Sequence, residues 1–182
     1  MPIYTKKGDK GTTSIFKKEK GKAVRLSKAD LLIETIGSVD EANSYLGILR
    51  SILIKGVMGI DLKKEIEYLQ KDLFTIGSML AGSKLQISDG RVGEFEDNID
   101  KMDQILPKLT NFILPGGSEI SAGLMFSRTL VRRAERRVVA LTKIRRVNPT
   151  ILIYLNRLSD YLFVLARWVN FKNNYKEMKW SN

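Results

Sequence analysis

FSRTLVRRAERR, residues 126–137, has the pattern of a helix with one packed face and one charged edge. The stretch contains neither proline nor glycine. Small or apolar residues recur through it at alternating steps of three and four, as on one face of an α-helix: Leu124, Ser127, Val131, Ala134, Val138 and Leu141. Arg128, Arg132 and Glu135 recur beside them at the same spacing. The stretch therefore predicts a helix packed among other helices, with cations at the rim of the core.

The arginines on this edge have two interpretations. Arginines one turn apart at the rim of a core are costly to desolvate without partners, and a guanidinium forks onto two phosphate oxygens. A phosphate site is the functional interpretation. The alternative is a solvated basic face in which Glu135 is the i,i+3 partner of Arg132.

Four more segments have helical periodicity. Apolar stripes run from Val39 to Leu53, from Leu62 to Leu80, from Phe95 to Leu109 and from Ile151 to Val169. We expect Pro107 to end or kink the third helix, Ser118 to cap the helix that runs to about residue 146, and Asn148-Pro149 to break it. Long helices with no convincing strand pattern predict an all-α fold, a five-helix antiparallel bundle. The expected organisation is one domain, residues 1–182, with the bundle in 31–172 and a tail in 173–182.

Composition limits the chemistry that the chain performs. Among 182 residues there are 31 Lys and Arg against 20 Asp and Glu, a net charge of +11, and there is no Cys and no His. The charge predicts an anionic partner such as a nucleotide, a nucleic acid or a membrane surface. Thiol nucleophiles, imidazole bases and Cys/His metal sites are excluded. No apolar run reaches the length of a signal peptide core or a membrane span, so we expect a soluble, cytoplasmic protein.

Residues 1–30 differ from the rest of the chain. They hold nine basic and three acidic residues, and TKKGDKGTTS is followed by the Lys-rich KKEKGKAVRLSK. We expect a glycine- and lysine-rich loop, extended at most around residues 3–5. Backbone amides, hydroxyls and lysines in such a loop suit a phosphate; the alternative is a flexible basic tail.

Two other features also leave alternatives open. Asn156 and Asp160 lie beside the apolar stripe of the last helix, either as a clamp to the arginine helix, which would supply a cation to Asp160, or as ligand contacts. Phe112 and Ile113 are apolar residues in a loop bounded by glycine and proline. They form either a hydrophobic plug on the end of the bundle or a wall for a large apolar ligand.

Taken together, several uncommon strings resemble one family. TKKGDKGTTS, GSVDEANSYLG (37–47), FILPGGS (112–118), SRTLVRRAERRVVAL and YLNRLSDYLFVLAR resemble, in this order, the PduO-type ATP:cob(I)alamin adenosyltransferases. The resemblance covers nearly the whole chain. It implies a five-helix bundle assembled as a homotrimer, with active sites between subunits. It also implies transfer of the 5'-deoxyadenosyl group of ATP to the cobalt of reduced cob(I)alamin, giving adenosylcobalamin and triphosphate, with Mg²⁺ accompanying the nucleotide.

The resemblance also assigns site residues, with none holding a metal. Those implied to bind ATP are Thr5, Lys6, Lys7, Gly8, Thr13, Ser14, Lys28, Arg132, Arg133, Glu135, Arg136 and Asn156. Phe112 is implied to occupy the lower face of the cobalt, and Asp40 to pair with Arg128 across the subunit interface. Arg132, Phe112, Asp40 and Arg128 are thus the implied catalytic set.

The chain departs from the family pattern at two places. KKEKGKAVRLSK is longer and more basic than the usual short turn, which leaves open whether Lys28 or Lys22 contacts phosphate. Met125 stands where the family often has His, which we expect to alter packing more than chemistry.

Two other function classes compete with the enzyme. One is a basic helical nucleic-acid-binding protein, disfavoured by Asp40, Glu135, Asn156 and Asp160 on the relevant faces. The other is a non-catalytic carrier of corrinoid or ATP. A corrinoid reductase and an adenosylcobalamin-dependent enzyme are expected partners; nucleic acid and membrane are not.

Overall fold

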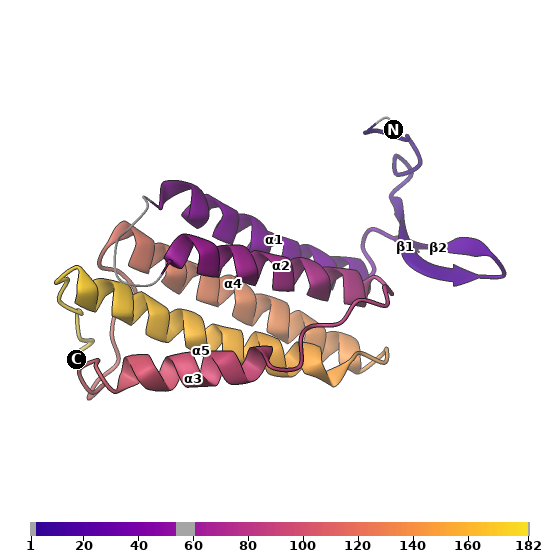
Figure 1. Ribbon diagram of the computed structural model, residues 1–182. Helices are drawn as coiled ribbons and strands as arrows, with labels where there is room; N and C mark the ends of the chain where they lie inside the picture. Colours follow the sequence, from indigo (N-terminus) through magenta and orange to yellow (C-terminus); the bar gives the residue numbers. More distant parts are fainter. Residues whose placement is uncertain (1–2, 54–60, 182) are drawn as a thin grey trace.

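Five α-helices preceded by a β-hairpin make up the part of the chain, residues 3–53 and 61–181, that this computed structural model describes (Figure 1). The elements are β1 (Thr12–Glu19), β2 (Lys22–Ser27), α1 (Leu31–Ile52), α2 (Leu62–Leu80), α3 (Arg91–Asp103), α4 (Glu119–Thr142) and α5 (Pro149–Lys172). The prediction of a five-helix bundle is confirmed. The all-α class is wrong because a two-stranded sheet precedes the bundle.

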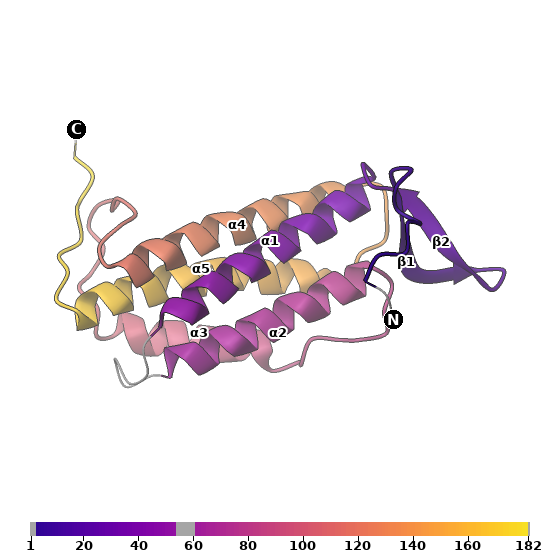
Figure 2. The ribbon, with the colours of Figure 1, turned by 90° about the horizontal axis from the view of Figure 1, so that it is seen from above.

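Helix α4, which carries the arginine stretch, lies between α1 and α5. Helix α2 packs against α1, and α3 against α5 (Figures 1 and 2). The apolar stripes predicted on α2, α4 and α5 are buried along their whole length. No helix among the described residues has an apolar stretch long enough to cross a membrane.

At the start of α1, α4 and α5 a side chain accepts a hydrogen bond from one of the first backbone N–H groups, which have no partner within the helix. Asp30 accepts from Leu32 N at 2.8 Å at the start of α1, and Ser118 accepts from Ser121 N at 3.2 Å at the start of α4, as predicted. Asn148 caps α5 and Pro149 occupies its first turn, where its missing N–H costs nothing.

Two helices end earlier than predicted. Helix α3 ends at Asp103, so Leu106 and Leu109 lie outside it. Asp103 is four residues before Pro107, and a proline ring clashes with the carbonyl at that position in a helix; Leu106 is nevertheless buried. Helix α4 ends at Thr142, where a tight turn replaces the predicted last turn.

The expected loop in residues 1–30 is wrong over 12–27, which form an antiparallel hairpin with Thr12 opposite Ser27 and Glu19 opposite Lys22. Lys20 and Gly21 at its tip have φ values of 49° and 78°. Two positive φ angles are the requirement of a two-residue turn whose twist matches the strands. The hairpin docks on the bundle where Phe16 N donates to Ala81 O at 2.9 Å.

Candidate functional site

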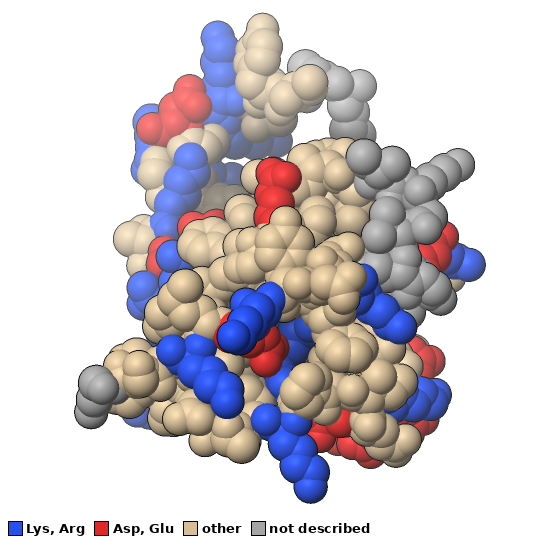
Figure 3. All heavy atoms as spheres, turned by 90° about the vertical axis from the view of Figure 1, so that its left-hand side faces the viewer, with Lys and Arg blue, Asp and Glu red and all other residues tan. Residues whose placement is uncertain are grey.

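A pocket of about 980 Å³ opens at the end of the bundle where α4 begins and α5 ends. Its walls come from the loop before α4, from α4 and α5, and from the C-terminal tail. The lining residues are Leu109, Thr110, Asn111, Phe112, Ile113, Pro115, Met125, Arg128, Asp160, Phe163, Trp180 and Ser181. Seen end-on, this end of the molecule is mostly uncharged surface, with Lys and Arg side chains and some Asp and Glu side chains spaced over it (Figure 3).

The loop carrying Phe112 is held by the C-terminal tail. Trp180 N donates to Phe112 O at 2.8 Å and Leu114 N donates to Met178 O at 2.9 Å, so the two segments form a short antiparallel bridge. The backbone of Phe112 is thereby held in place, while the residue as a whole is 81% exposed. A fixed, exposed phenyl ring beside a pocket is an apolar contact for a ligand, which favours the ligand-wall interpretation over a buried plug.

The turn between this loop and α4 is fixed by Asn170 of α5. Asn170 accepts from Ser118 N at 3.0 Å and donates to Gly116 O at 3.0 Å. Gly117, between them, has a φ of 101°, and a Cβ atom there would lie 2.2 Å from Asn170 Oδ1. Asn170 therefore fixes the Pro-Gly-Gly turn and the start of α4 together, and the turn requires glycine at position 117.

On α4 and α5, Arg128 and Asp160 supply charge to the pocket. The Arg128 guanidinium lies 5.5 Å from the centre of the Phe163 ring. Burial and the positive charge of Arg132 lower the pKa of Arg128, and Asp160 partly offsets this. Asp160 has its ion pair on its own helix, with Arg157 at 2.9 Å, so the alternative in which the arginine helix supplies its ion-pair partner does not form, although Arg128 acts on it through its charge. Arg157 lies one turn earlier on α5 and reaches it first.

Further along α4, Arg132 and Arg136 are exposed, and neither makes an ion pair within residues 3–53 and 61–181. The alternative pairing of Glu135 with Arg132 does not form, since Glu135 instead accepts from Asn156 Nδ2 at 3.1 Å. Arg133 instead reaches toward α1, where it pairs with Glu41. Two unpaired guanidinium groups one turn apart are suited to a polyanion.

Asn156 and Glu135 therefore form a polar clamp between α5 and α4, which is one of the two alternatives for Asn156. Asp40 lies exposed on α1. No ion pair joins Asp40 to Arg128 within the described part of this chain, so the pairing across a subunit interface stays a prediction.

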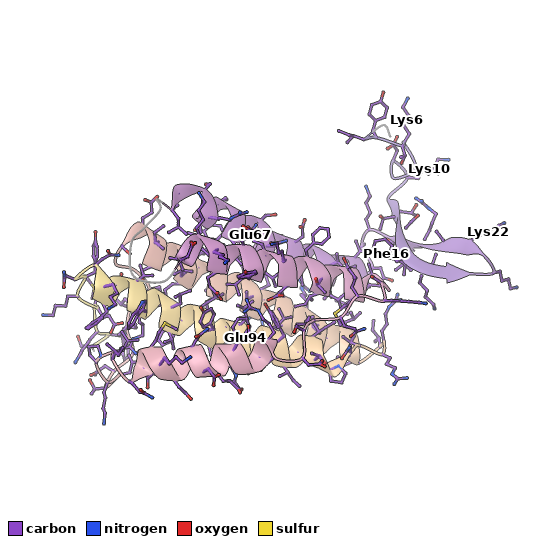
Figure 4. The ribbon with its side chains drawn as sticks, viewed as in Figure 1. Lys6, Lys10, Phe16, Lys22, Glu67 and Glu94 are labelled. Atoms are coloured by element: carbon purple, nitrogen blue, oxygen red, sulfur yellow. The ribbon has the colours of Figure 1, made fainter. Side chains whose placement is uncertain are left out.

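The N-terminal segment carries a separate group of polar residues. Lys28 Nζ lies beside Gly8, 3.5 Å from the position a Cβ would take there, and Lys28 N donates to Gly11 O at 2.8 Å. Lys22 lies at the tip of the hairpin, away from Lys6 and Lys10 (Figure 4). The structure thus places Lys28, and not Lys22, against the glycine loop.

Arg25 organises this segment. Its guanidinium donates to Lys7 O at 2.5 Å, to Thr12 Oγ1 at 2.6 Å and to Ser14 Oγ at 3.1 Å. It therefore ties β2 to the loop that contains Thr5, Lys6 and Lys7, and to the start of β1.

The structure does not bring all the predicted residues together in one chain. The hairpin and the loop before it project from one end of the bundle, and the C-terminus lies at the other (Figure 1). The C-terminal tail lines the Phe112 pocket through Trp180 and Ser181. Arg128, Arg132 and Arg136 occupy successive turns of α4 between these ends.

Two residues escaped the sequence analysis. Arg25 stands in KAVRLS, whose alternation of Val24 and Leu26 with polar neighbours is a strand signal that the surrounding lysines obscured. Trp180 lies in the tail, where no periodicity marks it, and only tertiary folding places it beside Phe112.

Comparisons with known proteins place the chain in a family. The family model described as cobalamin adenosyltransferase matches residues 3–169. The chain belongs to this family. The corrinoid adenosyltransferase of Bacillus subtilis (strain 168) is 40% identical over 185 residues, covering 99% of this chain and 92% of that protein. The corrinoid adenosyltransferase MMAB of Homo sapiens is 39% identical, covering 96% and 71%.

Solved structures extend the family match to three dimensions. An F112A variant of the PduO-type ATP:corrinoid adenosyltransferase from Lactobacillus reuteri, complexed with cobalamin and ATP, superposes with a TM-score of 0.91 at 35% identity and full coverage of both chains. An R132K variant complexed with ATP gives a TM-score of 0.88 at 36% identity, covering 98% of this chain and all of that one. The predicted resemblance to PduO-type adenosyltransferases is therefore confirmed.

Proposed function

We propose that this chain transfers the 5'-deoxyadenosyl group of ATP to the cobalt of a reduced corrinoid. The observation that carries the proposal is an apolar pocket with an exposed Phe112 on a fixed backbone, continued along α4 by Arg132 and Arg136, which have no carboxylate partner among the described residues. One part suits a large apolar macrocycle and the other a triphosphate. Family membership and relatives solved with ATP and cobalamin support the same reaction.

The bond changes fit a chain with no His or Cys. The Co(I) centre of the corrinoid substrate supplies an electron pair to C5' of ATP, the cobalt–carbon bond forms, and the C5'–O bond breaks. Its electrons leave with inorganic triphosphate. No proton is removed from carbon, so no general base is required, and the protein supplies alignment and electrostatic stabilisation.

The arginines act on the leaving group. Arg132 and Arg136 on α4 lie against the triphosphate, where their fixed charge stabilises the negative charge that grows as the C5'–O bond breaks. Lys28, beside Gly8, brings a further cation with the N-terminal loop. The other implied ATP contacts are Thr5, Lys6, Lys7, Thr13, Ser14, Arg133, Glu135 and Asn156.

Phe112 acts on the corrinoid. Its exposed ring occupies the lower axial position and excludes an axial base, which makes Co(II) easier to reduce to the nucleophilic Co(I) state. Asp40 of one subunit pairs with Arg128 of the next in a homotrimer. The separation of the hairpin from the pocket in one chain supports a site shared between copies (Figure 1).

Magnesium fits this site as an ion that arrives with the nucleotide. The described residues contain no cluster of three carboxylate, His or Cys side chains that would hold a metal, and nucleotide-bound Mg²⁺ typically uses phosphate oxygens with one or two carboxylates. Glu135, beside Arg132 and Arg136 on α4, is the available carboxylate. The ion would neutralise charge on the triphosphate.

The other function classes fit less well. A nucleic-acid face would not place Glu41, Glu135 and Asp160 among its arginines, and the comparisons do not favour it. A carrier would bind ATP and corrinoid without turnover. We propose a cytoplasmic enzyme that receives its corrinoid from a reductase and delivers adenosylcobalamin to an enzyme that uses it.

The test is a spectroscopic assay with ATP, Mg²⁺ and chemically reduced cobalamin, which follows loss of Co(I) and appearance of the cobalt–carbon product. Wild type should turn over and Arg132→Ala should lose most activity. Arg137→Ala is the matched control, since Arg137 lies on the same helix but pairs with Glu34 at 3.2 Å. Binding without turnover would favour the carrier, and binding of neither ligand would refute the proposal.

A further inference from the structure

Arg167 of α5 is a buried cation that the proposed reaction does not use. Its side chain is 1% exposed, although an unpaired charge at that depth would be strongly unfavourable. Asp103 lies 3.9 Å away but is itself 68% exposed. The close partners of Arg167 must therefore be elsewhere, and they come from two different segments.

The guanidinium forks onto the C-terminal tail and also reaches the loop before α4. Nε donates to Glu177 Oε1 at 2.8 Å and Nη2 donates to Glu177 Oε2 at 3.3 Å. Nη2 also donates to Pro107 O at 2.7 Å. Pro107 lies five residues before Phe112, and Glu177 three residues before Trp180. One side chain thus fixes the bases of both segments that wall the pocket.

Beyond Arg167 these two segments hold each other. Lys179 pairs with Ile113 in the bridge, Trp180 N donates to Phe112 O, and Lys179 Nζ donates to Thr110 Oγ1 at 3.3 Å. Few apolar contacts hold the tail otherwise, since Tyr175, Met178 and Trp180 are each about half exposed or more. The ion pair with Glu177 attaches the tail to a buried side chain of the bundle.

We propose that Arg167 is a positioning residue for the corrinoid pocket, holding the Phe112 loop and the C-terminal tail together through Pro107 O and Glu177. Without this clamp the bundle stays folded, but the tail and Trp180 leave the pocket. Corrinoid binding then weakens, whereas the α4 arginines and the N-terminal loop keep their geometry for ATP. The assignment of the pocket to the corrinoid rests on the proposed function; the clamp itself does not.

The test uses Glu177→Gln, because Glu177 lies in the tail and its substitution replaces no side chain of the bundle. The chain has two tryptophans, so a Trp168→Phe background leaves Trp180 as a fluorescent reporter of tail docking. Asp103→Asn is the matched control, since it removes the other carboxylate near Arg167. Arg167→Lys keeps the charge but not the fork, and should behave like Glu177→Gln.

Glu177→Gln should raise acrylamide quenching of Trp180 about twofold and increase KM for cob(I)alamin and Kd for cob(II)alamin about tenfold, equivalent to ~1.4 kcal/mol. KM for ATP and the far-UV circular dichroism spectrum should stay at wild-type values, and Asp103→Asn should match wild type throughout. Unchanged quenching would refute the clamp. Changed quenching with unchanged corrinoid affinity would refute its role in the pocket. A wild type that binds cobalamin without turnover would refute the proposed function only.

Discussion

Replacing Gly117 with alanine should destabilise the protein through a collision that the structure locates. The new Cβ would lie 2.2 Å from Asn170 Oδ1 and 2.4 Å from Nδ2, so the amide of Asn170 must move. Movement breaks its bonds to Ser118 N and Gly116 O, both 3.0 Å long. Asn170 is 4% exposed, so water does not readily replace these partners.

The cost has two parts. An alanine at a φ of 101° carries backbone strain of about 1–3 kcal/mol. The polar groups left without partners at the start of α4 add about 1–3 kcal/mol. The sum is ~2–6 kcal/mol, which for a chain of this size lowers Tm by roughly 4–24 °C.

Gly116→Ala is the matched control for this substitution. Gly116 is the preceding residue, a Cβ there meets nothing within 4 Å and its φ lies outside the left-handed region. Thermal unfolding followed by far-UV circular dichroism, at one protein concentration because assembly affects Tm, measures both variants. The Gly116 variant should stay within about 0.5 kcal/mol of wild type.

A second comparison separates collision from simple loss of hydrogen bonds. Asn170→Ala removes the amide, and in that background Gly117→Ala meets no side chain at the collision point. The destabilisation of the double variant should then be smaller than the sum of the two single values by about 1–3 kcal/mol. Additive values, or a Gly117 variant as stable as the Gly116 variant, would refute the reasoning.

Three further predictions concern the pocket, the interface and the core. Phe112→Ala should slow formation of four-coordinate Co(II) cobalamin with little effect on ATP binding, and an unchanged spectrum would remove its proposed role. Asp40→Asn should weaken corrinoid binding or assembly more than ATP binding; a wild-type trimer with normal corrinoid affinity would contradict this. Burial raises the pKa of Tyr154 and of Tyr161, so the folded state favours their neutral forms. Their stabilising effect should be complete below the ordinary pKa of about 10 and lost as the pH rises beyond it; urea unfolding across that range should show a weaker decline for Tyr161→Phe.

The bundle was predictable because burial alone determines most of it. The apolar stripes of α2, α4 and α5 are buried residue for residue as the spacing indicated. The helix ends were harder to predict. Leu106 belongs to the apolar pattern of α3 and is buried, yet it lies beyond the helix, because Pro107 prevents the helix from continuing past Asp103. An apolar pattern reports burial, which a turn supplies as well as a helix.

The hairpin was missed for a different physical reason. Its strands, β1 and β2, carry Ile15, Val24 and Leu26 toward partial burial, but lysines separate these apolar residues and a two-stranded sheet needs only a short alternation. Lys20-Gly21 at the tip supplied a turn signal that a Lys-rich context weakened. Arg25 owes its position to this hairpin, so it was missed with it.

The residues of the candidate site also fall into two groups, those that the sequence could identify and those that it could not. The sequence could identify Phe112, Arg132 and Arg136 because the fold does not use their side chains for packing or pairing. Phe112 is 81% exposed, and the two arginines have no ion pair among the described residues. Glu135, in contrast, had one plausible partner on its own helix and takes another, Asn156, from α5. A side chain whose role is to contact a ligand stands out in the sequence, because its charge or its exposed apolar surface is unfavourable and no neighbour in the sequence offsets it. Side chains that hold the site together, such as Asn170, Arg167 and Glu177, are compensated by distant segments, and only the folded chain identifies their partners.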